Sequence, residues 1–574
     1  MRSDIINLLP NDSVIQRLAV WSFIIVLVKP NGTIVIMQPE FYQYQNHLVY
    51  RGYDDAVYRH VLNSIKTAYR IRFDAIAVPR TLYNSQLLRR FNLPVAPVME
   101  FYDWPHGPDI DHPTAAQKLM ANFLVLHARS FNLSDMGTMK TLAALWAADF
   151  VMQQYPPGQC RCLINAPLNT LQRVWADALF ANFMARRSYQ IIHHGDGEKR
   201  REQLAMPADF YIINPDGLKV GAKLRRRFDL GGLSADLFNR HDIKISIVDE
   251  ASVYRDRRTG RHRVASVLYQ SARMPYLWLL TGTPVPNAPT DAYGLARLVN
   301  NAGGESYTDF HRRTMVQVSR FKWLPAHGSY AAAAKLLQPA IRFSIEQIWD
   351  GPPCTVQQRE IPLTATQDKL LRELKRELHL ELDGAGITPA NEAAARAKAL
   401  QIVQGAVYDH DHRAHAIDAG PRLAALEELI ETATRKVLIM VPLTSVINLL
   451  VDHLAKEGYG VIKINGEVSI KDREKLIAAF RADEKIRVAV CDAAAVAHGI
   501  NEFAAATTVV WYGPTDKAEL WLQGNKRAHR PGQRFPVTIV QFCATNLERE
   551  IFRRVEKAES LQGVMLKWIK DKTL

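Results

Sequence analysis

The chain has 574 residues, a net charge of +14 at pH 7 and a pI near 9.4. This length is too great for one hydrophobic core, so we expect several domains, and the basic excess favours a polyanionic partner, with nucleic acid the first candidate. Basic charge also serves membrane surfaces or solubility, so those alternatives stay open. With 48% hydrophobic and 23% charged residues, the composition is that of an ordinary globular protein and excludes a disordered chain.

The cysteines and the apolar runs of the sequence indicate the cellular compartment in which we expect the protein. Five cysteines occur, and none forms a CxxC pair; Cys160-Arg-Cys162 has no second pair to complete a zinc site. We expect buried or idle thiols in a reducing compartment. The apolar run Val20–Val28 is too short to span a bilayer, and the first residues show no signal-peptide pattern. The sequence therefore predicts a cytoplasmic protein without a membrane partner.

Residues 1–105 predict a small α+β accessory module. Two β-branched runs, Leu18–Val28 and Thr33–Met37, flank Asn31-Gly32, the strongest short hairpin signal. A helical pattern and a short apolar run follow, at Asp54–Ala68 and Ala75–Val78. The region carries no catalytic motif, so a structural brace is a simpler interpretation than a substrate-guiding role. Proline and glycine between Tyr102 and His112 predict a linker.

From 113 to 300, apolar strands alternate with helical patterns, which predicts a doubly wound α/β domain. Gln117 stands at its first helix, where an amide can read the Watson–Crick edge of adenine, although most glutamines are merely solvated. A loop with Gly137 then opens a second helix, so that backbone N–H groups can bind phosphate. Lys140 would reach the β- and γ-phosphates, and Thr141 would bind Mg²⁺.

The phosphate loop departs from the usual pattern at one position. Met139 precedes Lys140, where a second glycine is usual. If this position requires a positive φ, a methionine there is strained.

Two adjacent carboxylates follow an apolar run within Ile245–Ser252. The run fits a strand buried in a parallel sheet, whose carboxyl end is where ligands bind. There Asp249 can hold a divalent cation, and Glu250 can orient or deprotonate a water. A strand followed by an acidic helix start is the alternative. Arginines flank this site at 225–227 and 255–263; they indicate either a solvated face or contact with phosphate backbones.

The C-terminal half shows a different organisation. Residues 301–425 break the alternation with long helical patterns and predict a helical insertion, and a second α/β alternation fills 426–574. That second half has no glycine-rich phosphate loop, so we expect one nucleotide at the junction of the halves. Arg527 and Arg530 could neutralise charge on the γ-phosphate in the transition state, with a basic surface helix as the alternative.

The ordered set of segments resembles Swi/Snf-type ATPases of helicase superfamily two, in the compact form carried by bacteriophages and bacteria. The segments are Asp249-Glu-Ala-Ser, Leu280-Thr-Gly-Thr-Pro-Val-Pro-Asn287, His498-Gly-Ile-Asn501 and Gln523…Arg527-Ala-His-Arg530-Pro-Gly-Gln533. Asn165-Ala-Pro-Leu-Asn-Thr-Leu171…Trp175 and Ala390-Asn391…Gln404-Gly405 are similar to further family segments. The similarity covers roughly 113–565 and leaves 1–105 unexplained.

The resemblance implies two RecA-like parallel-sheet lobes that close on ATP and Mg²⁺. Under it, Gln117 contacts adenine, and Gly137, Lys140 and Thr141 hold the phosphates and metal. Asp249 holds magnesium and Glu250 activates water. The arginine fingers are Arg527 and Arg530, and Gln523 aligns the nucleotide. The family usually tracks along duplex DNA, and some members remodel forks or anneal strands.

Two departures from the family pattern leave alternatives open. Met139 replaces a loop glycine, and Lys526 replaces the glycine usual before the first finger. The first raises the alternative of a nucleic-acid clamp that does not hydrolyse ATP. An unwinding helicase on single-stranded DNA or RNA is the other alternative. If the chain is phage-encoded, the expected location is the host cytoplasm.

Overall fold

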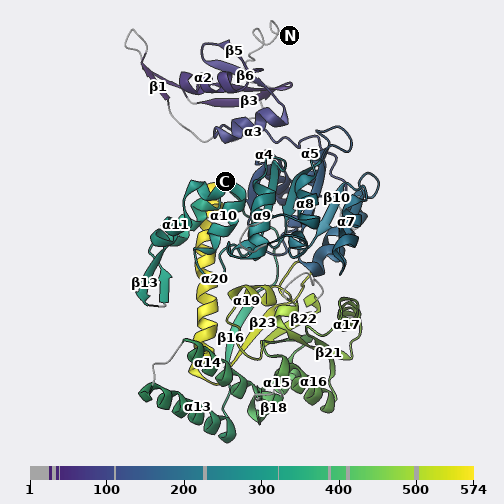
Figure 1. Cartoon of the computed structure of the whole chain (residues 1–574), viewed down its shortest axis with the longest axis vertical. Coiled ribbons are helices and arrows are strands. Elements are labelled where there is room, and N and C mark those ends of the chain that lie inside the picture. Colours follow the sequence, from purple (N-terminus) through teal and green to yellow (C-terminus); the bar gives the residue numbers. More distant parts are fainter. Residues whose placement is uncertain are drawn as a thin grey trace. The chain divides into compact units, whose positions relative to one another are not determined.

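A computed structural model describes the chain except residues 1–24, 29–33, 38, 109–111, 224–228, 321, 385–388, 409–413, 497–502 and 574. The chain forms two compact units (Figure 1). The first comprises 1–130 and 143–157, and the second comprises 131–142 and 158–574. No helix among the described residues is long and apolar enough to cross a membrane.

The first unit contains a small antiparallel sheet of four strands, in the order β3-β4-β6-β5. Its elements are β3 (Glu40–Tyr44), β4 (His47–Arg51), α2 (Asp55–Ser64), β5 (Tyr69–Arg72), β6 (Ala75–Pro79) and α3 (Leu82–Arg90). Alternating apolar residues such as Leu48, Tyr50 and Ile76 pack against Tyr58 and Val61 of α2. The α+β character expected for this region is confirmed.

A hairpin precedes that sheet, as predicted. Strands β1 (Ile25–Val28) and β2 (Ile34–Met37) pair antiparallel, while the Asn31-Gly32 turn lies outside the described residues. The first unit also includes α4 (Ala115–Leu126) and, from Ala143 onward, α5 (Lys140–Met152).

The second unit holds the first of two parallel sheets, which we call lobe 1. Its strand order is β15-β7-β12-β11-β8-β10-β9. The strands are β7 (Arg129–Asn132), β8 (Arg161–Asn165), β9 (Tyr189–Ile192), β10 (Phe210–Ile213), β11 (Ile243–Val248), β12 (Tyr276–Leu280) and β15 (Ala340–Ile341). Its helices include α6 (Asp177–Phe183), α7 (Gly197–Ala205), α8 (Gly232–Asn239), α9 (Gly260–Gln270) and α10 (Asp291–Asn300). All five residues of β12 are buried, as expected for a strand covered on both faces.

Lobe 2 is the second parallel sheet, in the order β16-β23-β22-β19-β21-β20. Its strands are β16 (Cys354–Glu360), β19 (Lys436–Val441), β20 (Gly460–Ile464), β21 (Ile486–Asp492), β22 (Ala506–Trp511) and β23 (Val537–Cys543). The helices of the alternation are α16 (Thr444–Lys456), α17 (Ile470–Ala482), α18 (Ala493–Val496) and α19 (Ala518–Asn525). The α/β class with two RecA-like lobes and an N-terminal α+β module is therefore observed.

The predicted helical insertion is more mixed than its helical patterns indicated. It contains α11 (Tyr307–Thr314), α12 (Ser329–Leu336), α13 (Ala365–Gly384), α14 (Pro389–Gln404) and α15 (Gly420–Thr432), and the hairpins β13 (Met315–Ser319)–β14 (Lys322–Pro325) and β17 (Ala406–Tyr408)–β18 (Ala414–Ala416). It also contributes one strand to each lobe: β15 pairs with β7, and β16 pairs with β23. Such pairings join residues far apart in sequence, so local patterns do not reveal them. The predicted boundaries at 300/301 and 425/426 stay predictions.

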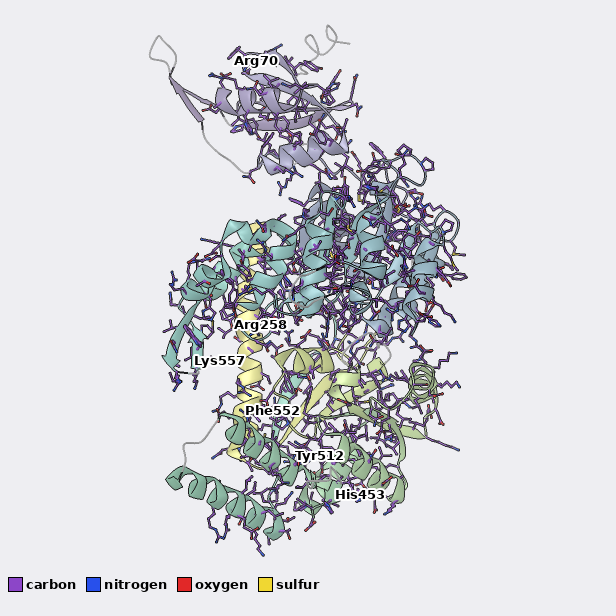
Figure 2. All side chains as sticks on the ribbon, in the orientation of Figure 1. Arg70, Arg258, His453, Tyr512, Phe552 and Lys557 are labelled. Atoms are coloured by element: carbon purple, nitrogen blue, oxygen red, sulfur yellow. The ribbon has the colours of Figure 1, made fainter. Side chains whose placement is uncertain are left out.

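The C-terminal helix α20 (Asn546–Thr573) packs against both lobes. Phe552, labelled in Figure 2, and Val555 join the core of lobe 2. Further along, Met565, Leu566 and Ile569 are buried in the core of lobe 1. One continuous helix therefore connects the two cores mechanically.

Candidate active site

The loop between β7 and α5 has the conformation that phosphate loops need. Gly137 has a φ of 81°, and Met139 has a φ of 58°. The positive φ that would strain a methionine at this position is therefore observed, because the Cβ of Met139 makes the left-handed region unfavourable. The Thr138 hydroxyl donates to the Asp135 carbonyl at 2.7 Å, which fixes the turn.

Lys140 begins α5 and turns its ammonium group back to the loop. Its Nζ donates to the carbonyl oxygens of Ser134 and Asp135, at 2.7 Å and 2.8 Å. Burial lowers the pKa of Lys140, whereas the negative charges of Glu250 and Asp249 oppose that shift. The carbonyl partners are neutral, so the charge of Lys140 is available to attract phosphate oxygens.

Asp249 stands at the carboxyl end of β11, and two hydrogen bonds fix its orientation. The Trp175 indole N–H donates to Oδ2 at 3.0 Å, and the Glu250 backbone N–H donates to Oδ1 at 3.0 Å. Burial raises the pKa of Asp249, and the bond from Trp175 and the charge of Lys140 oppose that shift. The carboxylate is positioned before any ligand arrives.

Glu250 adopts a left-handed backbone, with φ 45° and ψ 51°. Burial, followed by the neighbouring charge of Asp249, raises its pKa to about 8, and Lys140 opposes this. Its Oε2 is buried and has no hydrogen-bond partner among the described residues. An unsatisfied buried carboxylate oxygen and a strained backbone are both features of catalytic groups that bind a ligand or water.

Trp175 lies on a π-helical segment, η2 (Leu171–Ala176), between β8 and α6. The helical patterns of this region predicted ordinary helices, so the wider turn differs from that expectation. One extra residue per turn changes which side chains face the sheet, and such segments occur often at functional sites. Here Trp175 reaches Asp249.

Arg527 and Arg530 follow α19 and come from lobe 2. Burial, and then the charge of Arg530, lowers the pKa of Arg527 to about 10, whereas Glu250 raises it. Burial also lowers the pKa of Arg530. The two guanidiniums repel each other in a weakly solvated place, which favours the binding of an anion between them.

A single cavity of about 240 Å³ brings these groups together. It is lined by the loop residues Met136–Thr141, by Thr170, Val174, Asp249 and Glu250 of lobe 1, and by Lys526, Arg527 and Arg530 of lobe 2. Ligand pockets commonly measure about 300–1,000 Å³, so this one suits a phosphate chain better than a whole nucleotide.

Two of the candidate residues are not among those that line the cavity. Gln523 is buried on α19 and does not line the cavity; its side-chain amide donates weakly to Glu519 at 3.5 Å. Gln117 belongs to the other compact unit, where it forms a capping box with Thr114 at the start of α4. The adenine contact of Gln117 and the nucleotide contact of Gln523 remain predictions. His498–Asn501 and the arginines at 225–227 lie outside the described residues.

Glu519 is a residue that the sequence analysis missed. On α19 of lobe 2, it accepts a hydrogen bond from the Ser252 hydroxyl at 2.7 Å and pairs with Arg255 at 2.9 Å. Both partners follow the acidic pair of lobe 1. An isolated glutamate on a helix gives no sequence signal, because only the contact across the lobes distinguishes it.

The donor set suits a magnesium ion bound together with phosphate. Among the described residues, no cluster of three or more His, Cys, Asp or Glu side chains could hold a metal alone. Mg²⁺ is usually bound by one or two carboxylates with substrate phosphates. The carboxylate of Asp249 and the hydroxyl of Thr141 line the cavity beside the unpartnered Oε2 of Glu250, so the residues present fit this ion.

Two parallel-sheet lobes that share a cavity with a lysine loop, an acidic pair and two arginines define a RecA-like nucleoside-triphosphatase. Comparison with known proteins specifies the family. Residues 128–411 match the SNF2-related domain, and residues 421–532 match the helicase conserved C-terminal domain. The chain belongs to the Swi/Snf-type ATPases of helicase superfamily two.

Its relatives differ greatly in length. The SWI/SNF-related matrix-associated actin-dependent regulator of chromatin subfamily A-like protein 1 of Xenopus tropicalis is 22% identical over 75% of this chain, which spans only 43% of that relative. Protein p41 of Acyrthosiphon pisum secondary endosymbiont phage 1 is 26% identical over 80% of this chain and 99% of its own length.

Two solved structures are also similar. The Sulfolobus solfataricus SWI2/SNF2 ATPase core in complex with dsDNA covers 79% of this chain and 91% of its own, at 18% identity and a TM-score of 0.36. Dbp5 of S. cerevisiae bound to RNA and ADP BeF3 covers 80% of this chain and 95% of its own, at 14% identity and a TM-score of 0.47.

Proposed function

We propose that the chain is a DNA-dependent ATPase, a motor that uses ATP and Mg²⁺ to translocate along duplex DNA. The observation that carries this proposal is the shared cavity, where Lys140 and Glu250 of lobe 1 lie with Arg527 of lobe 2. Such a motor serves to remodel or anneal DNA structures during replication, recombination or repair.

Each residue has a distinct task in hydrolysis. Lys140 and the loop N–H groups bind the β- and γ-phosphates, while Arg527 and Arg530 stabilise charge that develops on the γ-phosphate. Glu250 orients the attacking water and takes its proton, for which its raised pKa is suited. Thr141 and Asp249 would hold Mg²⁺, which would neutralise phosphate charge when bound.

Contacts between the lobes offer a route from hydrolysis to movement. A Cβ added to Gly137 would stand 3.2 Å from the ring of Pro531, which follows Arg530. Glu519 meets Ser252 and Arg255 beside the acidic pair. Because these contacts join the lobes next to residues that line the cavity, ATP binding would close the lobes, product release would open them, and each cycle would advance the chain along one strand's phosphates.

Phosphate release tests the motor. With saturating duplex DNA, the wild-type chain should hydrolyse ATP far faster than the Lys140→Ala variant, which lacks the phosphate-binding ammonium group. Circular dichroism should show that the variant keeps its fold. Equal turnover in the two proteins would contradict the motor.

A clamp that binds nucleic acid without hydrolysis is the second candidate, and the positive φ of Met139 favours it. A strained loop residue could misplace the phosphates. The clamp predicts wild-type turnover no higher than that of Lys140→Ala, together with nucleic-acid binding that responds to ATP.

The kind of track is tested separately. Duplex DNA should stimulate hydrolysis more than single-stranded DNA or RNA of equal length. Stronger stimulation by single strands, with strand separation, would instead identify an unwinding helicase. The titrations should be repeated over a range of salt, because phosphate contacts weaken steeply as salt rises.

A further inference from the structure

A second cavity, of about 580 Å³, lies on lobe 1 away from the nucleotide cavity, and the two share no lining residue. Its walls come from α9, α10, η5 (Asn301–Gly304) and the start of α11. Helices α9 and α10 pack side by side (Figure 1). Three arginines line it: Arg257, Arg263 and Arg297.

Three arginines that are near this cavity in sequence, but do not line it, form ion pairs with carboxylates. Arg255 pairs with Glu519, Arg258 with Asp256, and Arg261 with Asp216. Ion pairs of this kind are what a solvated basic face normally contains, and they leave little net charge for a partner.

Two arginines that line the cavity lack such partners. Among the described residues, no carboxylate lies within ion-pair distance of Arg257 or Arg297. The Arg257 guanidinium lies over the Tyr307 ring, 4.3 Å from its centroid, and Arg297 donates to the Asn301 side chain. Both contacts orient the guanidinium without cancelling its charge.

Glu305, the carboxylate among the residues that line the cavity, already pairs with an arginine. Glu305 accepts two hydrogen bonds from Arg313, at 3.2 Å and 2.8 Å, and Arg313 does not line the cavity. His262 is buried and bonded to the Gly294 carbonyl at 2.9 Å. Burial lowers the pKa of His262; the bond to Gly294 and the charge of Asp256 oppose that shift, and the charges of Arg257 and Arg297 add to it, so both guanidiniums act on the same space. Among the described residues that line the cavity, three arginines face one glutamate, so the lining carries a net positive charge.

We propose that this cavity binds phosphate groups, and that a nucleic-acid backbone supplies them as it passes lobe 1. Guanidinium forks bind phosphate oxygens in pairs, and orientation by Tyr307 and Asn301 reduces the cost of ordering them. The choice of nucleic acid rests on the proposed function. A free polyphosphate offers the same chemistry and is distinguished by the test below.

The test uses the full chain with Arg257→Gln/Arg297→Gln. The matched control is Arg258→Gln, because Arg258 is adjacent in sequence, its side chain is 83% exposed and paired with Asp256, and it does not line the cavity (labelled in Figure 2). Binding of labelled duplex and single-stranded DNA is measured by fluorescence anisotropy over a range of salt. Each phosphate contact contributes about 0.9 to the slope of log K against log salt for duplex DNA. In the double variant, the slope of log K against log salt should fall by the contribution of about two phosphate contacts. In the control, the slope should not change.

Three further measurements distinguish a lost phosphate site from a folding defect and from loss of the motor. Arg257→Lys/Arg297→Lys keeps both charges, so it should restore most of the slope with weaker affinity, whereas a folding defect would not be rescued. Basal ATPase without DNA should be unchanged, so the proposal can fail while the motor stands. Titration calorimetry measures the binding of inorganic tripolyphosphate. If the Gln variant loses a tripolyphosphate site while its DNA slopes are unchanged, the cavity binds phosphate and a free anion is its source. Unchanged DNA slopes together with unchanged tripolyphosphate binding would overturn the proposal.

Discussion

The two lobes share an architecture but differ in the connection that follows the first strand of each alternation. In lobe 1, residues 133–139 separate β7 from α5 and contain Gly137 and Met139, both with positive φ. In lobe 2, only Pro442 and Leu443 separate β19 from α16. A two-residue connection presents too few N–H groups to surround a phosphate, so of these two connections only that of lobe 1 can form a phosphate loop.

Lobe 2 contributes at another place. Arg527 and Arg530 follow α19 and line the cavity opposite the acids of lobe 1. The difference between the lobes suggests a division of tasks, in which one lobe binds the triphosphate and activates water and the other stabilises the transition state. Variants on either side should therefore slow hydrolysis while ATP still binds.

The largest effect is expected from Arg527→Ala. Loss of an arginine that stabilises transferring phosphate typically lowers turnover by about 10³–10⁵-fold. ATP binding should persist, because Lys140 and the loop are intact. Single-turnover hydrolysis provides the measurement, and Arg534→Ala, an exposed arginine of the same segment, is the control. Turnover within tenfold of wild type would remove Arg527 from the mechanism.

On the lobe 1 side, Glu250→Gln should abolish hydrolysis while ATP still binds. The amide has the same shape but cannot accept the proton of water, and such losses are about 10²–10⁴-fold. Phosphate release and binding of a fluorescent ATP analogue are measured on the same preparation. Near-normal release would rule out the role assigned to Glu250.

A smaller effect is expected where the lobes touch. Glu519→Gln weakens the contacts with Ser252 and Arg255. For a partly exposed pair, the lost interaction free energy is about 1 kcal/mol, which should lower DNA-stimulated turnover about fivefold. Arg255→Gln should cause a similar loss, and the double variant should lose no more than either alone. Losses that add would show that the two residues act independently.

The smallest effect, and an opposite one, is predicted for Met139→Gly. A left-handed residue with a Cβ costs about 1–2 kcal/mol, and the added freedom of glycine in the unfolded chain offsets about 0.4–1 kcal/mol of the gain. Turnover should rise by less than about fivefold, because only the part of this strain that is relieved in the transition state changes the rate. Met139→Ala keeps the Cβ and is the matched control; if alanine and glycine behave alike, strain at this position does not limit the reaction.

Local signals in the sequence predicted much of this molecule. The β-branched run before Asp249 indicated a buried strand, and the observed β11 ends at Val248. The absence of a glycine before Lys140 raised the question of whether Met139 has a positive φ, and the observed φ is positive. Both follow from steric rules that act within a few residues.

Features that depend on distant residues could not be predicted. The bond from Trp175 to Asp249 spans 74 positions, and β16 pairs with β23 although about 180 residues lie between them. Glu519 carries no local signal, because its partners Ser252 and Arg255 belong to the other lobe. Burial of Glu250, which raises its pKa, likewise arises only in the folded structure.

A double-mutant cycle on Glu250→Gln and Arg527→Ala tests most directly whether the lobes act on one nucleotide. Single-turnover hydrolysis is measured for wild type, both single variants and the double variant, with ATP binding recorded for each. Residues that act on one transition state are strongly non-additive, so the double variant should be about as slow as the slower single variant. If the two losses multiply in full, the base and the arginine do not act on the same phosphate.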